Sequence, residues 1–346
     1  MKKTIAFSLV LVLLVGLLAG CAGTAVVYYS DSTCPHDKVP VNPPAEGAVK
    51  TGLAVITSVK DSENAKVAKY DVTLVAVTVD DNGIIEQCII DSIGTEIGID
   101  GTGALTKVPE TVATKNELGD SYGMVAWGGA KHEWYQQAAA LADYAEGKNI
   151  TQLKEGAIDE TGYAPDGSDL ASSASIYLGG YVSAIEAAVQ NAIHLGAMAG
   201  DELRLAAVPS VASSAAATES KAGNAQLDVD VTALTVKDGV ITSCFIDSVQ
   251  AKVTFDANGE ISSDINSPVL TKGQLGENYG MAAWGGAKHE WNVQAANFAA
   301  YVTGKTAAQV AGIAVNEGTK PTDADLSAGV TIAIGGFQAL IAKALA

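Results

Sequence analysis

A close internal duplication constrains this chain more than any other feature. YGMVAWGGAKHEW spans residues 122–134 and YGMAAWGGAKHEW spans residues 279–291, and the two strings differ only at Val125 and Ala282. Buried apolar positions tolerate exchanges of similar volume, so core packing alone does not require this identity. The string also contains Trp, Gly-Gly, Lys and His, which are poor generic core residues. The duplication predicts one task performed twice.

The segments around the string repeat at the same distance. YDVTLVAVTVDDNGIIEQCIIDS matches LDVDVTALTVKDGVITSCFIDS, and DLASSASIYLGGY matches DLSAGVTIAIGGF, at a spacing of about 156 residues. This period is too long for a solenoid and fits duplicated globular domains. We predict homologous domains at residues 51–199 and 200–346, with residues 213–225 as a loop insertion in the second.

Each copy shows the same order of local patterns. An alternating run from Asp71 to Val79 is followed by Asp81-Asn82-Gly83, which predicts a β-hairpin, and Asp238-Gly239 predicts the equivalent turn. Helical patterns follow, closed by Gly147 and Gly304. The expected helices cover residues 131–146, 150–157 and 180–194, with counterparts that end in a helix over 336–346. Hairpins with segregated helices indicate an α+β fold, with an antiparallel sheet and several packed helices in each domain.

The N-terminus predicts export. Lys2 and Lys3 precede an apolar run, residues 5–18, which is too short to span a membrane and is typical of a secretory signal. We therefore expect a signal peptide over residues 1–20 and a flexible, Gly- and Pro-rich tether over residues 21–50. The net charge of −18 argues against nucleic acid as a partner and against adsorption to an anionic membrane surface.

The end of the apolar run, Leu18-Ala19-Gly20-Cys21, resembles the lipobox of bacterial lipoproteins. The resemblance implies cleavage before Cys21 and lipidation of that residue. The mature protein would then lie on the outer face of the cytoplasmic membrane or in the cell envelope, anchored only by its lipid.

The other cysteines give no metal site. Cys34 lies in the tether without the ligands that a metal would need, and no function is assigned to it. Cys88 and Cys244 occupy equivalent strand positions in the two copies. They are either two buried strand thiols or a disulfide between the copies.

A hydroxyl residue precedes a Gly-Gly pair and a helix in both copies. These residues are Ser175, before Gly179-Gly180, and Thr331, before Gly335-Gly336. Helix N-termini offer unpaired amides, and glycines allow a backbone to approach an anion closely, so a phosphate could be held here. The alternative is a helix N-cap or an ordinary loop hydroxyl.

The pattern Asp-x-x-[Ser/Thr]-x-Ala-[Ser/Thr] before a terminal helix resembles FMN-binding domains, including that of the sodium-pumping quinone reductase. Over nearly the whole mature chain, the sequence is similar to flavinylated, pheromone-precursor-type lipoproteins of Gram-positive extracellular electron transfer. The shared features are the lipobox, the duplicated domain, the LGDxYGM segment and the Lys-x-Glu-Trp helix start. The resemblance implies that a flavin transferase attaches FMN through a phosphoester to Ser175 and Thr331. Asp169 and Asp325 would be the acidic residues that the transferase recognises.

The resemblance also suggests a task for the duplicated string, because aromatic rings can cover a flavin and a nearby cation can stabilise its reduced, anionic form. The open alternatives are a core position for Trp134, an exposed position for Trp127 and a surface position for His132. The expected cofactor-binding residues are Tyr122, Trp127, Gly128, Gly129, Lys131, His132 and Trp134, and in the second copy Tyr279, Trp284, Gly285, Gly286, Lys288, His289 and Trp291.

The resulting hypothesis is an extracellular electron carrier that is tethered to the membrane and holds up to two FMN groups. It would take electrons from a membrane quinol-linked donor and pass them to an extracellular acceptor. No G-x-S-x-G, HExxH or P-loop motif is present, so we expect an electron-transfer protein rather than a catalyst. The alternative is a flavin-free ligand-binding or adhesion lipoprotein with two similar pockets.

Overall fold

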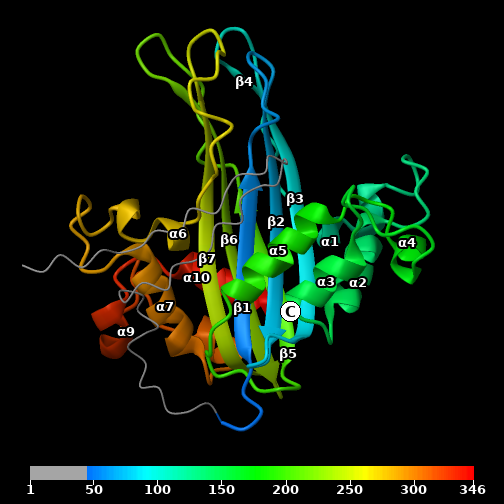
Figure 1. The fold of residues 1–346 in the computed structure, drawn as a ribbon. Helices are drawn as coiled ribbons and strands as arrows, with labels where there is room; N and C mark the ends of the chain where they lie inside the picture. Colours follow the sequence, from blue (N-terminus) through cyan, green and yellow to red (C-terminus); the bar gives the residue numbers. More distant parts are fainter. Residues whose placement is uncertain (1–44) are drawn as a thin grey trace, which may run out of the picture.

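The computed structural model describes residues 45–346 and has a mixed α/β architecture with two antiparallel sheets (Figure 1). The predicted signal peptide, Cys21, Cys34 and the tether up to residue 44 lie outside the described residues. Strand β1 begins at Lys50, the last residue of the predicted tether, and Ala48 forms a bridge with Met198.

The first sheet contains four strands in the order β1-β2-β3-β4. The predicted hairpin joins β2 to β3, and Asp80 closes its turn by accepting hydrogen bonds from the backbone amides of Asn82 and Ile84. Both flanking strands extend beyond the predicted segment. The strands are β1 (Lys50–Ser58), β2 (Val67–Val79), β3 (Ile85–Ile99) and β4 (Leu105–Lys107).

The second sheet contains three strands, β5 (Glu202–Ser210), β6 (Gly223–Lys237) and β7 (Val240–Phe255), in that order. Asp238 and Gly239 form the two-residue turn between β6 and β7, and both have positive φ, as a type I′ hairpin requires. The loop insertion predicted over residues 213–225 is shorter than expected, because β6 already begins at Gly223.

The two sheets pack face to face. One apolar cluster contains Leu53, Tyr70 and Ile93 of the first sheet together with Val229 and Phe255 of the second, all essentially inaccessible to solvent. Side chains of β2 are buried on both faces along its second half, because this cluster lies on one side and helices lie on the other. The two copies therefore share a core, and their organisation as two separate domains stays a prediction.

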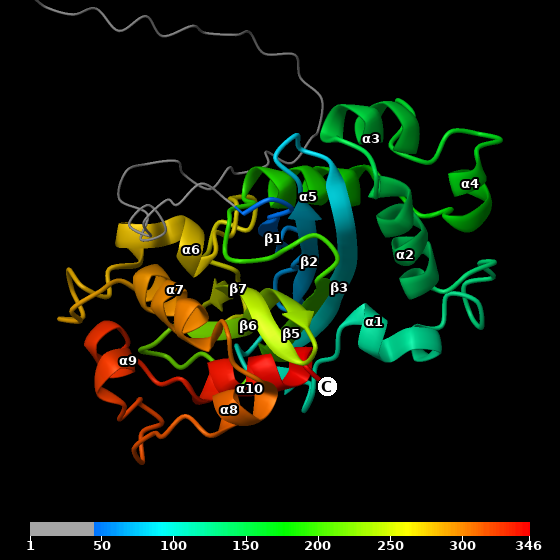
Figure 2. The same ribbon diagram turned by 90° about the horizontal axis from the view of Figure 1, so that it is seen from below.

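The helices form the two outer layers (Figure 2). Helices α5 and α2 cover the first sheet, and α10 and α7 cover the second. In the described chain, the first copy contains α1 (Lys115–Leu118), α2 (Trp134–Ala145), α3 (Ile150–Ala157), α4 (Asp169–Ser173) and α5 (Gly179–Gln190), and the second contains α6 (Lys272–Leu275), α7 (Trp291–Val302), α8 (Ala307–Ala311), α9 (Ala324–Gly329) and α10 (Gly335–Ala344). Short 3₁₀ helices at Gly119–Tyr122 and Gly276–Tyr279 follow α1 and α6.

The helix predicted over residues 131–146 is shorter than expected. It begins at Trp134, because Glu133 is its extended N-cap residue and forms a capping box with Gln136. The predicted last helix of each copy also ends early, at Gln190 and at Ala344.

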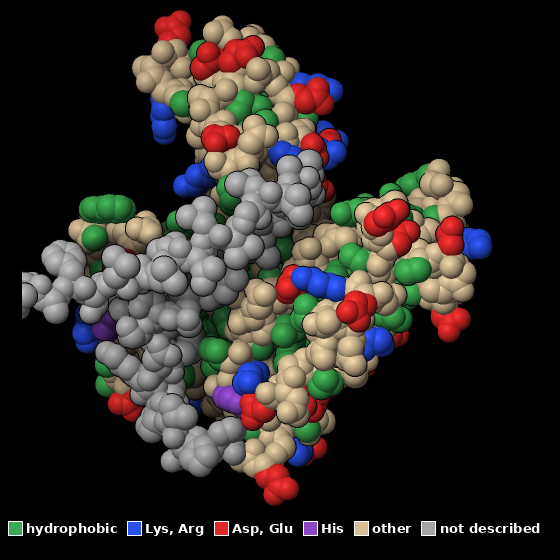
Figure 3. All heavy atoms as spheres, viewed as in Figure 1, with side chains coloured by type: hydrophobic (Ala, Val, Ile, Leu, Met, Phe, Trp, Pro, Cys, Tyr) green, Lys and Arg blue, Asp and Glu red, His purple; other side chains and the backbone are tan. Residues whose placement is uncertain are grey.

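Acidic and basic side chains are interspersed on the face shown in Figure 3. Within residues 45–346, no helix combines the length and the apolar character needed to cross a membrane.

Candidate functional site

The two predicted acceptor hydroxyls lie in equivalent, exposed positions. Ser175 lies between α4 and α5, and Thr331 lies between α9 and α10. The N-cap residues of the following helices are Leu178 and Ile334, so the interpretation of Ser175 and Thr331 as helix N-caps is wrong. Both hydroxyls belong to extended segments that solvent, or a modifying enzyme, can reach.

A buried glutamine holds the segment that contains each predicted FMN-accepting hydroxyl, Ser175–Ile176 and Thr331–Ile332, which we call the acceptor segments. Gln137 Oε1 accepts hydrogen bonds from the backbone N–H groups of Ser175 at 2.8 Å and Ile176 at 3.1 Å, and from the Ser175 hydroxyl at 3.3 Å. Gln294 Oε1 makes the same three contacts in the second copy, at 2.7 Å to the amide of Thr331, 3.2 Å to its hydroxyl and 3.1 Å to the next amide. Both glutamines are essentially inaccessible to solvent. The acceptor segments are therefore held by helices α2 and α7.

The same glutamines connect the acceptor segments to the duplicated string. Gln137 Nε2 donates to the carbonyl oxygen of His132 at 2.8 Å, and Gln294 Nε2 donates to that of His289 at 2.8 Å. Each glutamine thus accepts hydrogen bonds from the segment of Ser175 or Thr331 through its side-chain oxygen, and donates one to the string through its side-chain nitrogen. The string and the acceptor hydroxyl form one hydrogen-bonded unit in each copy.

A buried glutamate shapes the loop inside the string. The carboxylate of Glu133 accepts from the backbone amides of Met124 at 2.8 Å and Val125 at 2.9 Å. Glu290 makes the equivalent pair of bonds, both at 2.8 Å. Hydrogen bonds to a carboxylate are stronger than those between neutral groups, so this residue fixes the loop ahead of the helix. Part of the string's identity therefore has a structural cause.

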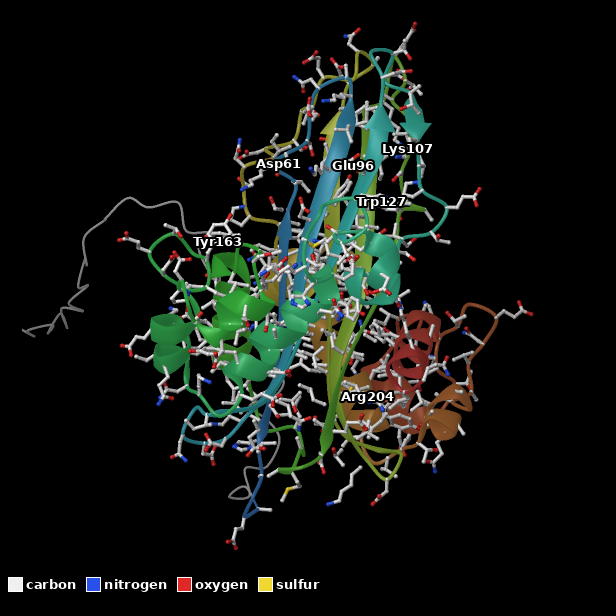
Figure 4. All side chains as sticks on the ribbon, turned by 90° about the vertical axis from the view of Figure 1, so that its right-hand side faces the viewer. Asp61, Glu96, Lys107, Trp127, Tyr163 and Arg204 are labelled. Carbon is white, nitrogen blue, oxygen red and sulfur yellow. The ribbon has the colours of Figure 1, made fainter. Side chains whose placement is uncertain are left out.

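The four tryptophans separate into two kinds. Trp134 and Trp291 are 3% and 5% exposed, which confirms the core interpretation of Trp134. Trp127 and Trp284 are 83% and 82% exposed, which confirms the exposed position predicted for Trp127. Figure 4 labels Trp127 on the side of the molecule that faces the viewer.

The exposed tryptophan rings rest on glycines. A Cβ atom on Gly123 would lie 2.3 Å from the ring of Trp127, and one on Gly280 would lie 2.0 Å from the ring of Trp284. Both glycines have positive φ, which other residues adopt at a cost. The two loops therefore present their tryptophans in the same way.

In both copies a lysine lies over two aromatic rings of the string. Lys115 Nζ is 5.1 Å from the ring centroid of Tyr122 and 5.0 Å from that of Trp134. Lys272 Nζ is 5.5 Å from the centroid of Tyr279 and 5.0 Å from that of Trp291. These are cation–π distances, so each site combines a cation with two aromatic rings of the string.

A cavity of about 250 Å³ opens beside the second acceptor segment. It reaches the residue after Thr331, and so brings together the acceptor segment, the string and the start of α10. Its lining contains Asp230, Lys272, Tyr279, Met281, Trp291, Ile332, Ala333, Gly336 and Phe337. Trp284, Lys288 and His289, which the sequence analysis assigns to cofactor binding, are not part of this lining.

Burial changes the charge balance in the second site. Removal from water raises the pKa of Asp230, and a hydrogen bond from Ser248 and the positive charge of Lys272 oppose this shift. Removal from water lowers the pKa of Lys272, and the charges of Asp230, Asp228 and other neighbours oppose it. Burial also raises the pKa of Tyr279. The cavity thus holds an acid and a base, and the charge of each opposes the effect of desolvation on the other.

The other predicted residues lie around the acceptor segments. Asp169 and Asp325 are exposed in the first turns of α4 and α9. Lys288 Nζ donates to the carbonyl oxygen of Ala328 at 3.1 Å, while Lys131 is exposed. The predicted glycine pairs begin α5 and α10 (Gly179, Gly180, Gly335, Gly336) or follow the exposed tryptophans (Gly128, Gly129, Gly285, Gly286).

The strand cysteines are free thiols. Cys88 and Cys244 are both buried, so the disulfide alternative is wrong and the thiol alternative is confirmed. Burial raises the pKa of both, to about 12 for Cys244. Neither thiol is suited to redox chemistry in the folded protein.

The sequence analysis did not assign several residues of the site. Gln137 and Gln294 recur at the same place in WYQQAAA and WNVQAAN, and Lys115 and Lys272 recur in the TKNEL and TKGQL segments. Their recurrence was the available signal. Asp230 had no such signal, because the first copy has Thr73 at that position.

No family model matches this chain, and neither the curated proteins nor the solved structures contain a match. Within residues 45–346, no group of three or more His, Cys, Asp and Glu side chains is arranged to hold a metal ion.

Proposed function

We propose that this protein is a membrane-anchored extracellular electron carrier with FMN attached through phosphoesters to Thr331 and Ser175. The observation that carries the proposal is the repeated unit in which a buried glutamine joins an exposed hydroxyl to the duplicated string. In the second copy this unit borders a cavity with aromatic walls and a lysine.

The residues of the second site fit a flavin. Tyr279 and Trp291 offer aromatic surface to a planar ring system. Lys272 would favour negative charge on the ring, and reduction of a flavin develops such charge. The cavity is smaller than the roughly 300–1,000 Å³ typical of small-molecule pockets, so it would cover part of the ring and leave an edge accessible for electron exchange.

The acceptor segments fit a covalent modification. Ser175 and Thr331 are exposed, while the backbone on either side is held by hydrogen bonds and by buried neighbours. Asp169 and Asp325 lie exposed in the preceding short helices, where a flavin transferase would reach them. Covalent attachment would prevent loss of the cofactor outside the cell.

The remaining parts of the proposal come from the sequence. Lipidation of Cys21 would keep the carrier at the outer face of the cytoplasmic membrane, near a quinol-linked donor. Extracellular acceptors would then take the electrons. The net charge of −18 would limit adhesion of the tethered protein to anionic lipid.

Mass spectrometry tests the proposal directly. Residues 22–346 would be produced together with an active flavin transferase, and intact mass with peptide mapping would count and locate the FMN groups. We expect adducts on the peptides that contain Ser175 and Thr331, with loss of one adduct in Ser175→Ala and of the other in Thr331→Val. Absence of both adducts, while the transferase modifies a control substrate, refutes the proposal.

The alternative is a flavin-free binding protein, and the preformed cavity beside Ile332 favours it. In that case the cavity itself, rather than a bound flavin, would capture a small aromatic or anionic ligand next to Lys272. Retention of such a ligand by protein without FMN, abolished in Lys272→Met, would support this function.

A further inference from the structure

The two sites differ in some of the residues that line the cavity beside Thr331 or that lie at the equivalent positions beside Ser175. The cavity-lining residues Asp230, Ala333 and Phe337 correspond to Thr73, Tyr177 and Tyr181 in the first copy. The strand registers confirm the first correspondence, because Asp230 pairs with Ser248 in β6–β7 as Thr73 pairs with Ser92 in β2–β3. The lysine and the two aromatic rings are retained in both sites.

Asp230 is the difference that changes charge. Its side chain lines the cavity from β6, opposite the start of α10, where a Cβ atom on Gly336 would lie 3.3 Å from its Oδ2. Lys272 lines the same cavity from α6. The first site has the lysine without this carboxylate, because Thr73 is neutral.

Other charges around the pair are matched only in part between the copies. Asp228 and Asp247 act on Lys272, and their equivalents Asp71 and Asp91 are present in the first copy. Lys252, which lies outside the cavity lining, also acts on Lys272, and the first copy has Glu96 at the corresponding position. Among the residues that line the cavity, Asp230 is the one whose charge differs from that of its counterpart in the first copy.

We propose that Asp230 makes the second site the weaker electron acceptor, so that electrons shared by the two flavins collect at the first site. The inference rests on the proposed attachment of FMN at both positions. A carboxylate next to a ring opposes the negative charge that reduction adds, and it also neutralises part of the effect of Lys272. The first site has Lys115 and, at the position of Asp230, the neutral Thr73.

The exchange needs no further reactant. With FMN on both residues, two electrons would pass from the group at Thr331, which would be oxidised, to the group at Ser175, which would be reduced. The protons that accompany the electrons are released to solvent at one site and taken from solvent at the other.

The test uses protein with a single FMN in each site. Thr331→Val leaves the Ser175 group, Ser175→Ala leaves the Thr331 group, and mass spectrometry verifies each before a potentiometric titration. Asp230→Asn is then added to the second form and Thr73→Asp to the first. Asp238→Asn is the matched control, because it removes one carboxylate from an exposed turn outside the cavity.

We expect Asp230→Asn to raise the ratio of reduced to oxidised flavin at Thr331 about tenfold at a fixed potential, a shift of about 30 mV for a two-electron couple. Thr73→Asp should lower the ratio at Ser175 by a similar factor, and Asp238→Asn should change neither by more than about twofold. Equal effects of Asp230→Asn and Asp238→Asn overturn the inference while the proposed function stands.

A second readout needs no flavin. In the unmodified protein, NMR titration of the lysine side chains should show that Asp230→Asn lowers the pKa of Lys272. An unchanged Lys272 titration overturns the electrostatic basis of the inference. Absence of FMN on both hydroxyls refutes the proposed function and, with it, the inference.

Discussion

Gln294→Leu is the most direct perturbation of the proposed site, because this buried side chain joins the acceptor segment to the duplicated string. Leucine fills a similar volume but removes the acceptor of the Thr331 and Ile332 amides and the donor to His289. A buried polar group left without a partner costs about 1–3 kcal/mol. The acceptor segment is exposed on one side, so water would recover part of this loss.

We therefore expect Gln294→Leu to lower the free energy of unfolding by about 2–4 kcal/mol. For a protein of this size, this corresponds to a fall in Tm of roughly 3–6 °C. The loss of stability should be largest near the substituted residue, because only Thr331, Ile332 and His289 lose hydrogen-bond partners. Amide hydrogen exchange of residues 325–337 should accelerate more than exchange in β6.

The assay combines denaturant unfolding with hydrogen exchange followed by mass spectrometry. Ala300→Ser is the control, since residue 300 is exposed on the same helix and its substitution should cost no more than about 0.5 kcal/mol. Gln137→Leu should reproduce the effect at Ser175 in the first copy. If Gln294→Leu leaves exchange unchanged and costs no more than the control, the glutamine does not hold the acceptor segment.

Three further predictions concern other parts of the two sites. Cys88 and Cys244 should not react with thiol reagents in native protein and should react fully in denaturant. Because burial raises the pKa of both thiols, their contribution to stability is complete below about pH 8.5 and is lost as the pH rises towards 12. Denaturant titrations between about pH 7 and 10.5 should therefore show a falling free energy of unfolding. Trp134→Ala should cost about 3–5 kcal/mol by calorimetry, whereas Trp127→Ala should cost about 0.5 kcal/mol or less, and similar costs would contradict the division into buried and exposed rings. Gly280→Ala should cost about 1–2 kcal/mol because of its positive φ and should displace the neighbouring exposed indole, visible as a shift of that indole N–H in NMR; an unmoved signal would contradict the close packing.

The sequence predicted the local elements better than their assembly. The hairpin turns at Asp81-Asn82-Gly83 and Asp238-Gly239 follow from residues that favour positive φ, and they lie where they were expected. The face-to-face packing of the sheets was not expected. Local periodicity reports that a strand is buried and does not report which partner buries it.

The start of helix α2 was also predicted wrongly, because local periodicity does not report hydrogen bonds to residues outside the helix. The pattern from Lys131 onward is compatible with a helix, but Glu133 forms bonds to Met124 and Val125 that hold it in an extended conformation. Those bonds join residues that a helical wheel treats as unrelated. The first helical residue is therefore Trp134, whose ring enters the core.

The duplication is the most informative feature for separating structural from functional residues. Glu133 and Glu290 recur because both loops need a buried carboxylate, and Gln137 and Gln294 recur because both acceptor segments need the same anchor. These residues explain why the framework of the two sites is the same in both copies. Trp127 and Trp284 recur without a structural requirement of this kind, because their rings are more than four-fifths exposed. Under the proposed function, these two exposed rings would be available to a partner that approaches both loops in the same way.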